Sequence, residues 1–585
     1  MTFGPGSMVD LPDASVIVAG LDHWRYDNDA IPTIEEPRLV RKLCELLQTN
    51  TLSLRSPPPS IDQPGAFKPD IIVWRFPEWF IVQKAEMSPR GFRTRRLIHA
   101  NSLDGNRYTD PDSRKKVAVV PVRFVRACRK GHVGDIDWKE FVHGSRTDCV
   151  RQLWMEERGT SGDLDEVWVT CDCGAARAMS QAARMELRAL GSCNGARPWL
   201  GAGSREPCGD PNRLLIRSAS NAYFPQLLSV ISIPDSRQPV DDSVRALWDD
   251  FLSDVTSVEE VAKAKKKPSV AARLGSCEDD DILESIQRIR SGGSDDRSVK
   301  AVEFEAMSEA KSEIGSDVPD GQFYARSVPK EHWDAPWMNA FERIVLVHRL
   351  REVVAQVGFT RFEAAGPDIQ GELSMDVQPA KLAVDAAWLP AIENRGEGIF
   401  LLLKPDIVDA WAKRPQVVAR ESQLSVGFEY WKKDHQATGR EFPGIVYYML
   451  HSLSHLLMTA ISLECGYPAS SLRERVYAID GRYGVLIYTG SSDAEGTLGG
   501  LVEAGRTISR HVRRALELGS LCSNDPICAY HTPSKHDHHA LSGSACHGCL
   551  LVAETSCEQR NDFLDRGLVV GTVESLGAEF FPGIS

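Results

Sequence analysis

Cysteines carry most of the chemistry that this sequence offers. The chain of 585 residues contains 14 cysteines, several of them in close pairs. No N-terminal stretch has the basic-then-apolar layout of a secretory leader, so we expect a cytoplasmic protein. In a reducing cytoplasm, closely spaced thiols favour metal over disulfides. The pattern therefore predicts zinc centres that stabilise the fold.

The first predicted centre lies in a glycine-rich stretch that begins with CDCG. Four thiolates complete a tetrahedral zinc shell, and such closed shells are structural. The predicted ligands are Cys171, Cys173, Cys193 and Cys208. Buried free thiols are the alternative, because the spacing in CDCG is less specific than CxxC. Upstream, Cys128 and His132 could replace a ligand or hold a second ion, but a core cysteine and a turn-capping histidine are favoured.

The second predicted centre lies near the end of the chain, where CHGC forms a knuckle that directs two thiolates at one ion. Five cysteines compete for four positions. The predicted ligands are Cys528, Cys546, Cys549 and Cys557, with Cys522 as the substitute. A thiol oxidoreductase is disfavoured, because it needs one exposed low-pKa thiol rather than a cluster. The two centres together predict two structural zinc ions.

Histidines give a weaker metal signal. His451 and His455 lie four residues apart, on one face of a predicted helix. That spacing can bind metal, but no glutamate follows His451, as hydrolytic zinc would require. Hydrogen-bonded core histidines are therefore favoured. The cluster of His536, His538 and His539 is interpreted as an exposed loop.

Two arginine clusters are candidates for contacts with nucleic-acid phosphates. The first is a stripe on one predicted helix, formed by Arg506, Arg510, Arg513 and Arg514. The second consists of Arg93, Arg95 and Arg96, with Arg90 nearby. A solvated surface is the alternative for each. The turn GSSDAEGTLGGL before the first cluster can hold an anion through its amides, although Asp493 and Glu495 would repel a phosphate.

Signatures of enzymes are missing. No Gly-Lys dipeptide occurs, so there is no phosphate loop for ATP. No His-x-Lys pair, GxSxG elbow or HExxH occurs either. The net charge of −13 excludes a uniformly basic nucleic-acid coat, so any such contact needs local patches. We therefore expect no catalytic site.

The elements that position these residues mix helices and strands. Apolar patterns predict helices over residues 37–47, 341–357, 444–463 and 497–518. They predict strands over residues 70–74, 78–83, 117–125, 398–403 and 484–490. Residues 241–320 are interpreted as charged surface helices with a mobile linker. No run approaches the ~20 apolar residues that cross a bilayer, so we expect no membrane partner.

These elements predict a mixed α/β (α+β), multidomain fold with two cysteine-rich zinc modules. The N-terminal α/β region spans 1–120, and the first zinc module spans 121–240. A charged helical linker region spans 241–334, and a second α/β unit spans 335–515. The C-terminal zinc module spans 516–585.

The C-terminal third resembles the helicase-associated zinc-binding domain family called MZB. The resemblance rests on HSLSHLLMTAI, GVLIYTGSSDAEGTLGGL and the final cysteine cluster. From about residue 50 to 570 the chain resembles the DrmB family of the DISARM anti-phage system, in RFVRACRKGHVGDIDWKEFVH, GFTRFEAAGP, AIENRGEGIF and SCEQRNDFLDRGL. Members of that family often carry a cysteine knuckle after the FPEWF segment. This chain has FIVQKAEMSPRG there, so no N-terminal zinc site is expected.

The resemblance implies a partner. A DrmA-like superfamily-two helicase would hydrolyse ATP in a complex that engages DNA, and this chain would supply scaffold and part of the DNA path. We therefore expect a non-catalytic helicase subunit in phage defence. One alternative is a metal-dependent nuclease that uses His451 and His455 with Asp493 or Glu495. Another is a protein scaffold without DNA contact.

Overall fold

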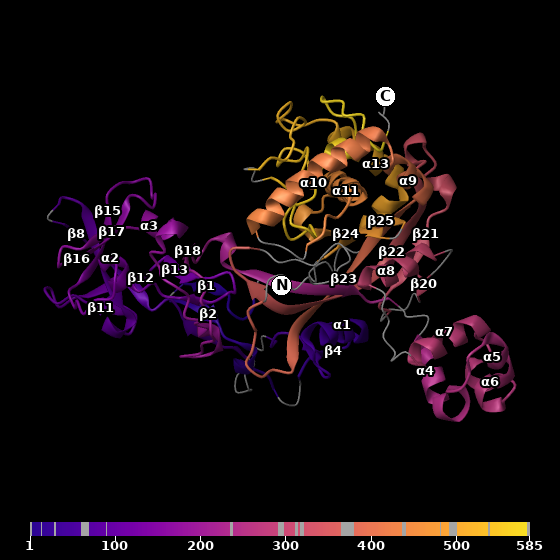
Figure 1. The fold of residues 1–585 in the computed structure, drawn as a ribbon, viewed down its shortest axis with the longest axis horizontal. Helices are drawn as coiled ribbons and strands as arrows, with labels where there is room; N and C mark the ends of the chain where they lie inside the picture. Colours follow the sequence, from indigo (N-terminus) through magenta and orange to yellow (C-terminus); the bar gives the residue numbers. More distant parts are fainter. Residues whose placement is uncertain are drawn as a thin grey trace. The chain divides into compact units, whose positions relative to one another are not determined.

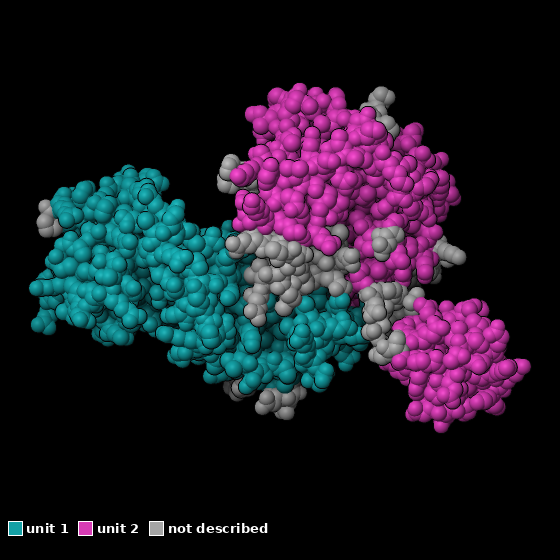
Figure 2. Space-filling view, in the orientation of Figure 1, with its two compact units in different colours: residues 1–229, 353–368, 373–393 teal, residues 230–352, 369–372, 394–585 magenta. Residues whose placement is uncertain are grey.

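The computed structural model describes residues 3–581 apart from 13, 28–30, 60–69, 89, 234–237, 291–297, 311–313, 316–320, 364–378, 436–439, 480, 491–499 and 536–538. The chain forms two compact units (Figure 2). Unit 1 contains residues 1–229, 353–368 and 373–393, and unit 2 contains residues 230–352, 369–372 and 394–585. Helices and strands occur in both units, which confirms the mixed, multidomain class.

Unit 1 consists mainly of antiparallel sheets, several of whose strands are labelled in Figure 1. The largest sheet has the strand order β10-β11-β12-β8-β9-β15-β16-β17. These strands are β8 (Trp79–Met87), β9 (Arg93–His99), β10 (Leu103–Asp104), β11 (Arg107–Thr109), β12 (Lys116–Pro121), β15 (Leu153–Glu157), β16 (Val167–Cys171) and β17 (Ala176–Ala178). Side chains alternate between the two faces of a strand. Accordingly, Ile81 and Leu97 join one buried cluster, whereas Phe80 and Ile98 join another.

Shorter elements complete unit 1. One small sheet joins β1 (Met8–Leu11), β2 (Ala14–Val18) and β7 (Val73–Arg75), and another joins β14 (Val133–Gly134), β13 (Phe124–Ala127) and β18 (Arg213–Ile216). Two strands, β3 (Trp24–Arg25) and β6 (Asp70–Ile71), pair with each other. The remaining short strands are β4 (Thr33–Ile34) and β5 (Ser53–Arg55). The helices are α1 (Pro37–Leu47), α2 (Trp138–His143) and α3 (Ser180–Ala183), and α1 matches its prediction.

Unit 2 contains most of a sheet with the strand order β20-β21-β22-β23-β25-β24. Residues 353–360 and 388–393 of this sheet belong to unit 1. The strands are β20 (Ile314–Gly315), β21 (Tyr324–Ser327), β22 (Phe341–Thr360), β23 (Trp388–Leu403), β24 (Leu472–Ile479) and β25 (Arg482–Thr489), and β19 (Phe224–Ile231) pairs with β22. Both faces of the sheet are buried. Leu401 and Ile487 face a large apolar cluster, and their neighbours Phe400 and Leu486 face a second one.

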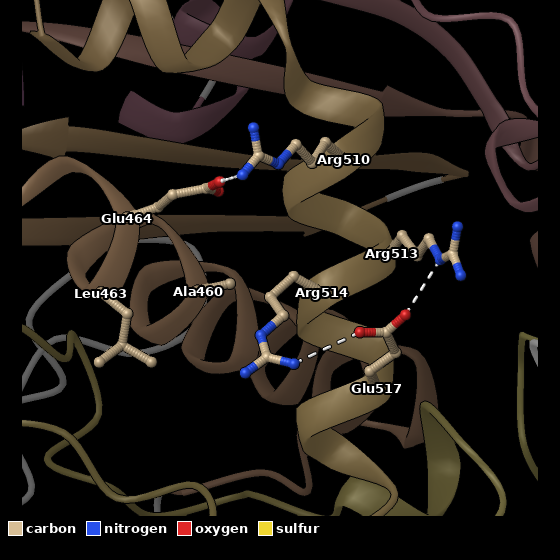
Figure 3. A pocket seen from close by; sticks show the side chains of 7 residues that line it. All are labelled: Ala460, Leu463, Glu464, Arg510, Arg513, Arg514 and Glu517. Atoms are coloured by element: carbon tan, nitrogen blue, oxygen red, sulfur yellow. Dashed lines mark hydrogen bonds and ion pairs between the residues drawn. The ribbon is translucent and has the colours of Figure 1, made fainter.

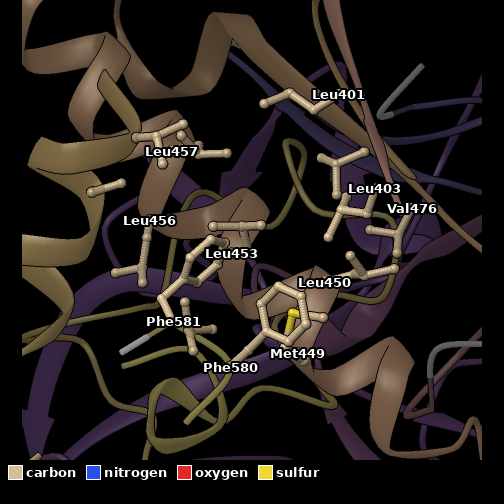
Figure 4. Close-up of a cluster of buried hydrophobic side chains, with 14 of the residues drawn as sticks. Leu401, Leu403, Met449, Leu450, Leu453, Leu456, Leu457, Val476, Phe580 and Phe581 are labelled. Carbon is tan, nitrogen blue, oxygen red and sulfur yellow. The ribbon is translucent and has the colours of Figure 1, made fainter. Parts of the chain in front are cut away.

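Helices cover this sheet. The helices are α8 (Val299–Ser308), α9 (Pro405–Ala412), α10 (Pro415–His435), α11 (Ile445–Cys465), α12 (Gly500–Arg506) and α13 (Ile508–Gly519). The long helix α11 lies against β24, β25 and α13. On the other face, Phe304 of α8 joins the cluster of Phe400. The residues of α11 that face the sheet fill the large apolar cluster (Figure 4).

The apolarity of α11 exceeds our expectation. Its length and composition suffice for crossing a membrane, with a mean hydropathy of 1.2, although we expected no such run. However, 83% of its apolar window is buried inside the protein. Such burial is typical of a core helix, and Gly466 in the left-handed region (φ 71) ends the helix.

The helix predicted over residues 341–357 is wrong, because these residues form strand β22. Ile344 and Leu346 face one apolar cluster, whereas Val345 and Val347 face the other. A strand buried on both faces has few polar positions to mark its period of two, so helical spacing can be read into it. The helix predicted over 497–518 is also divided, because α12 ends before Thr507 and α13 begins after it.

The charged region after residue 237 is more ordered than a set of surface helices. It contains α4 (Gln238–Ala246), a π-helix (Trp248–Leu252), α5 (Val258–Ala264), α6 (Pro268–Leu274) and α7 (Asp279–Arg290). Val244, Leu252, Val261, Val270 and Ile282 are buried together in a core of their own. Residues 291–297 of this region lie outside the described residues.

Candidate metal centres

Metal-binding side chains gather in four groups within the described part of the chain, and in each group four donor atoms lie within 4.8 Å of one another. Three groups are rich in cysteine. Centre A consists of Cys128, His132, Cys193 and Cys208. Centre B consists of His143, Cys149, Cys171 and Cys173. Centre C consists of Cys522, Cys528, Cys546 and Cys549.

Centre A forms where a tight hairpin meets an irregular loop. Cys128 follows β13, and the chain turns back at Gly131, whose φ of 84° favours glycine. This turn places His132 Nδ1 3.3 Å from Cys128 Sγ and 3.6 Å from Cys193 Sγ. The other ring nitrogen, Nε2, lies 2.6 Å from Glu206 Oε1. A carboxylate behind a histidine is a common way to orient a metal ligand.

Centre B forms at the end of α2 and the end of β16. The Asp137 carboxylate caps α2 by accepting from the Glu140 N–H at 3.0 Å, and His143 is the last residue of that helix. His143 Nδ1 lies 2.8 Å from the Lys139 carbonyl, so Nδ1 carries the ring hydrogen and Nε2 faces Cys173 Sγ at 3.2 Å. The arrangement leaves a lone pair of His143 directed at the thiols.

Centre C forms between the loop after α13 and the CHGC knuckle. The sulfur atoms of Cys522 and Cys546 lie 3.4 Å apart, and those of Cys528 and Cys549 lie 3.7 Å apart. The Gly548 N–H donates to Cys546 Sγ at 3.3 Å. These sulfur separations exclude disulfides, whose S–S bond is ~2.05 Å. They approach the ~3.8 Å between ligands of a tetrahedral ion with ~2.3 Å Zn–S bonds.

Electrostatics favour the thiolate at one cysteine of centre B and one of centre C, whereas burial and neighbouring thiols raise the pKa of Cys171 and Cys549. The Ala175 N–H, followed by contacts with Cys171 and His143, lowers the pKa of Cys173 to about 6. The contact with Cys549 is the main cause that lowers the pKa of Cys528 to about 6. Thiolate and imidazole donors in closed sets of four suit zinc.

The structure corrects the first predicted ligand set. Cys171 and Cys173 belong to centre B, whereas Cys193 and Cys208 belong to centre A, so the four cysteines do not share one position. Cys128 and His132, interpreted as core and cap, complete centre A. His143 and Cys149 of centre B were missed. The sequence already offers Cys128 and His132 as replacement ligands or a second site, but no local pattern connects His143 with Cys149.

The second predicted set also changes. Cys522, named as the substitute, takes the fourth place in centre C, and Cys557 lies elsewhere. Cys557 joins His451, His455 and Glu474 in a group that we name the buried quartet. Both histidines are buried and hydrogen-bonded, as expected for core histidines. Their common neighbours Glu474 and Cys557 were not expected.

The other predicted features give less evidence for a functional site. His539 is exposed, whereas His536, His538, Asp493, Glu495 and most of the glycine turn lie outside the described residues. The α13 arginines are exposed and surround a hollow of about 440 Å³ (Figure 3). Each is paired with a carboxylate: Arg510 with Glu464, and both Arg513 and Arg514 with Glu517. Arg506, outside this hollow, pairs with Glu503 at 3.4 Å.

The second arginine cluster lies on β9. Adjacent strand residues point to opposite faces. Arg95 pairs with Glu157, whereas Arg96 lies 3.6 Å from Glu86 and over the Trp154 ring. Arg93 at the start of the strand is exposed. Arg95 and Arg96 therefore do not form one continuous basic surface.

Comparison with known proteins connects these centres to described families. Residues 1–224, which contain centres A and B, match a domain of unknown function (DUF8724). Residues 453–550, which contain centre C, match the MrfA Zn-binding domain. A DISARM protein DrmB of Bacillus paralicheniformis is 32% identical over 543 residues, which cover 89% of this chain and 92% of the relative. These matches confirm both resemblances seen in the sequence, and the chain belongs to the DrmB family.

Proposed function

We propose that this chain is a non-catalytic subunit of a cytoplasmic DISARM-type anti-phage assembly, in which it works with a DrmA-like superfamily-two helicase. The observation that carries the proposal is the similarity to a DISARM protein DrmB along 89% of the chain. The full sequence contains no Gly-Lys phosphate loop, so ATP hydrolysis would come from the partner.

Metal would give this subunit its shape. We infer one structural zinc ion in each of centres A, B and C, three ions where the sequence predicts two. The donor sets are closed, with four protein ligands each and no position left for a reacting water. Zinc here would hold loops in place, and it would not catalyse a reaction.

The α13 arginines are the best support for a DNA contact. The side chains of Arg510, Arg513 and Arg514 are 75%, 52% and 55% exposed, and they line one hollow (Figure 3). A DNA phosphate would have to replace Glu464 and Glu517 as their partner. Such exposed pairs are weak, so replacement costs little. Contacts through Arg93, Arg95 and Arg96 stay a prediction with less support.

The nuclease alternative receives no support from the histidines. His451 and His455 are both 0% exposed, so a phosphodiester could not reach their nitrogens without unfolding. A pure scaffold without DNA contact remains the competing function, and a binding experiment distinguishes the two.

The partnership is tested by co-expression with a DrmA-like helicase of the same organism. We expect the two chains to co-purify, the complex to hydrolyse ATP and this chain alone to show none. A complex whose helicase carries an alanine for its phosphate-loop lysine is the matched control. ATP turnover by this chain alone, or failure of the chains to associate, would contradict the proposal.

The DNA path is tested with the triple variant Arg510→Ala, Arg513→Ala and Arg514→Ala in the complex. Loss of three phosphate contacts should reduce the slope of log affinity against log salt by about 2 for single-stranded DNA. The control replaces three exposed arginines of unit 1, Arg107, Arg184 and Arg188, which keeps the net charge equal. Equal affinity of both variants would favour the scaffold without DNA contact.

A further inference from the structure

We propose that the buried quartet is a fourth metal site, which binds zinc or a similar borderline divalent transition-metal ion. The matched MrfA Zn-binding domain spans residues 453–550. It includes His455 and Glu474, but His451 and Cys557 lie outside it. The quartet is also separate from the cysteines of centre C. Neither family match therefore accounts for it.

Regular secondary structure directs three of the four donors to one point. His451 and His455 are one turn apart on α11, and their ring centroids are 4.6 Å apart. Glu474 alternates along β24 with Leu472 and Val476, which both join the apolar cluster that contains α11. A strand presents such residues on one face, so the Glu474 carboxylate faces the two histidines.

The donor atoms of the buried quartet lie close to one another and are buried from solvent. Glu474 Oε1 lies 2.8 Å from His451 Nε2 and 3.1 Å from His455 Nε2. Cys557 Sγ lies 3.1 Å from His451 Nε2. The two histidines are 0% exposed, Glu474 is 3% exposed and Cys557 is 7% exposed. Bulk solvent therefore does not reach these polar groups.

The outer hydrogen bonds direct lone pairs into the centre. His451 Nδ1 faces the Phe563 carbonyl at 3.3 Å, and His455 Nδ1 faces the Leu550 carbonyl at 2.8 Å. A carbonyl only accepts, so both rings carry their hydrogen on Nδ1 and both Nε2 atoms are free to bind a cation. Carbonyl partners of this kind are typical of histidines that bind metal. The Ser454 hydroxyl donates to the other oxygen of Glu474, which orients the carboxylate.

A purely hydrogen-bonded quartet fits this arrangement less well. Both Nε2 atoms point to the same oxygen of Glu474, so each would need a second ring hydrogen to donate. Two imidazolium ions would then be buried beside a single carboxylate and a thiol, which is costly. A divalent ion with two neutral imidazoles, one carboxylate and one thiolate has no net charge.

The donor types limit the ion and its role. Magnesium and calcium prefer sets of oxygen ligands, whereas nitrogen and sulfur donors suit zinc. Four protein ligands leave no open position, so the site is structural. It would join α11, β24 and the segment that carries Cys557. The Leu550 carbonyl behind His455 directly follows Cys549 of centre C, so a single turn of chain would support both ions.

The test is the number of metal ions per chain, measured by native mass spectrometry and elemental analysis on the full-length protein after a chelator wash. We expect four ions in the wild type and three in each of two near-isosteric variants, Cys557→Ser and Glu474→Gln. Cys557→His supplies a replacement donor and should restore the fourth ion. The control Cys465→Ser changes an exposed cysteine outside all four groups and should keep four ions.

An unchanged count in both folded variants overturns the proposal. If neither variant folds, the wild type decides. Three ions there, with one lost on serine substitution of Cys193, Cys173 or Cys546 in turn, would leave none for the buried quartet. The measurement needs no helicase and no DNA, so its outcome is independent of the proposed function.

Discussion

The candidate metal centres of unit 1 lie among loops and short elements, whereas the buried quartet of unit 2 lies on a long helix that is enclosed by apolar side chains. Centres A and B join loops and short elements, and the loop over residues 185–212 contains only 3-10 turns and isolated bridges. In unit 2, α11 lies inside an apolar cluster that extends from Trp333 to Phe581 (Figure 4). Ordering a residue costs about 1–2 kcal/mol of backbone entropy, which a core offsets and a bare loop does not. Unit 1 has an apolar core of its own, so we infer that metal there orders the loops beside this core, whereas α11 is ordered mainly by its apolar contacts.

Removal of metal should cause the largest difference in hydrogen-exchange protection between the two units. Structural zinc contributes about 10–16 kcal/mol in small zinc domains, so a strong chelator should unfold the loops of centres A and B. The helix α11 should keep its protection, because its apolar contacts remain. Hydrogen exchange followed by mass spectrometry would report both regions in one sample. Equal loss of protection in α11 and in residues 185–212 would contradict the comparison.

A cavity in the core should affect unit 2 alone. Leu453 is 0% exposed on α11, and Leu453→Ala should lower the free energy of unfolding by about 2–5 kcal/mol. Thermal unfolding with the metal retained would measure the loss. Leu463→Ala on the same helix is the control, because Leu463 is 69% exposed and should change stability by less than about 0.5 kcal/mol. Similar losses in both variants would mean that the apolar cluster does not stabilise unit 2.

A substitution at the carboxylate that orients His132 should test whether centre A binds metal. Glu206 contacts His132 and also pairs with Arg197 at 2.8 Å. Glu206→Gln weakens the orientation of His132, so zinc affinity at centre A should fall by about 10- to 100-fold. Competition with a chromogenic chelator would measure it, with the exposed Glu186→Gln as the control. Unchanged affinity would place His132 outside the ligand set.

The smallest effect is expected at the surface of unit 2. Glu517 pairs with Arg513 at 3.0 Å and with Arg514 at 3.4 Å; both arginines are exposed and Glu517 is partly exposed. Glu517→Ala should change the free energy of unfolding by about 0–1 kcal/mol, because solvent screens such pairs. Chemical denaturation at low and high salt would measure it. A loss above about 2 kcal/mol would show that this surface, and not only the core, supports unit 2.

Local sequence predicted the elements whose signals are local. The helix α1 begins at Pro37, which suits the first helical position, and the apolar run of α11 lies between Gly444 and Gly466. The pattern over 341–357 failed, because β22 is buried on both faces and a period of two is then hidden. Burial of both faces depends on the helices that cover the sheet, which no window of the sequence contains.

The candidate sites divide in the same way. The residue types alone identified cysteine as the main candidate metal donor. The CHGC knuckle placed Cys546 and Cys549 together, because two intervening residues direct both thiols to one point. The other candidate donors lie close to partners that are far away in the sequence. Cys171 ends β16 and lies in centre B, whereas Cys193 lies in centre A.

The sequence by itself determined the family, the lack of a phosphate loop, the supply of thiols and the long apolar helix, because each is a property of composition or of neighbouring residues. Only the tertiary structure decided which donors meet. His143 lies at the end of helix α2 and contacts Cys173, and Glu474 lies on strand β24 and contacts His451. Pairing of distant strands and packing of helices bring such atoms within a few ångströms, and neither leaves a fixed spacing in the chain.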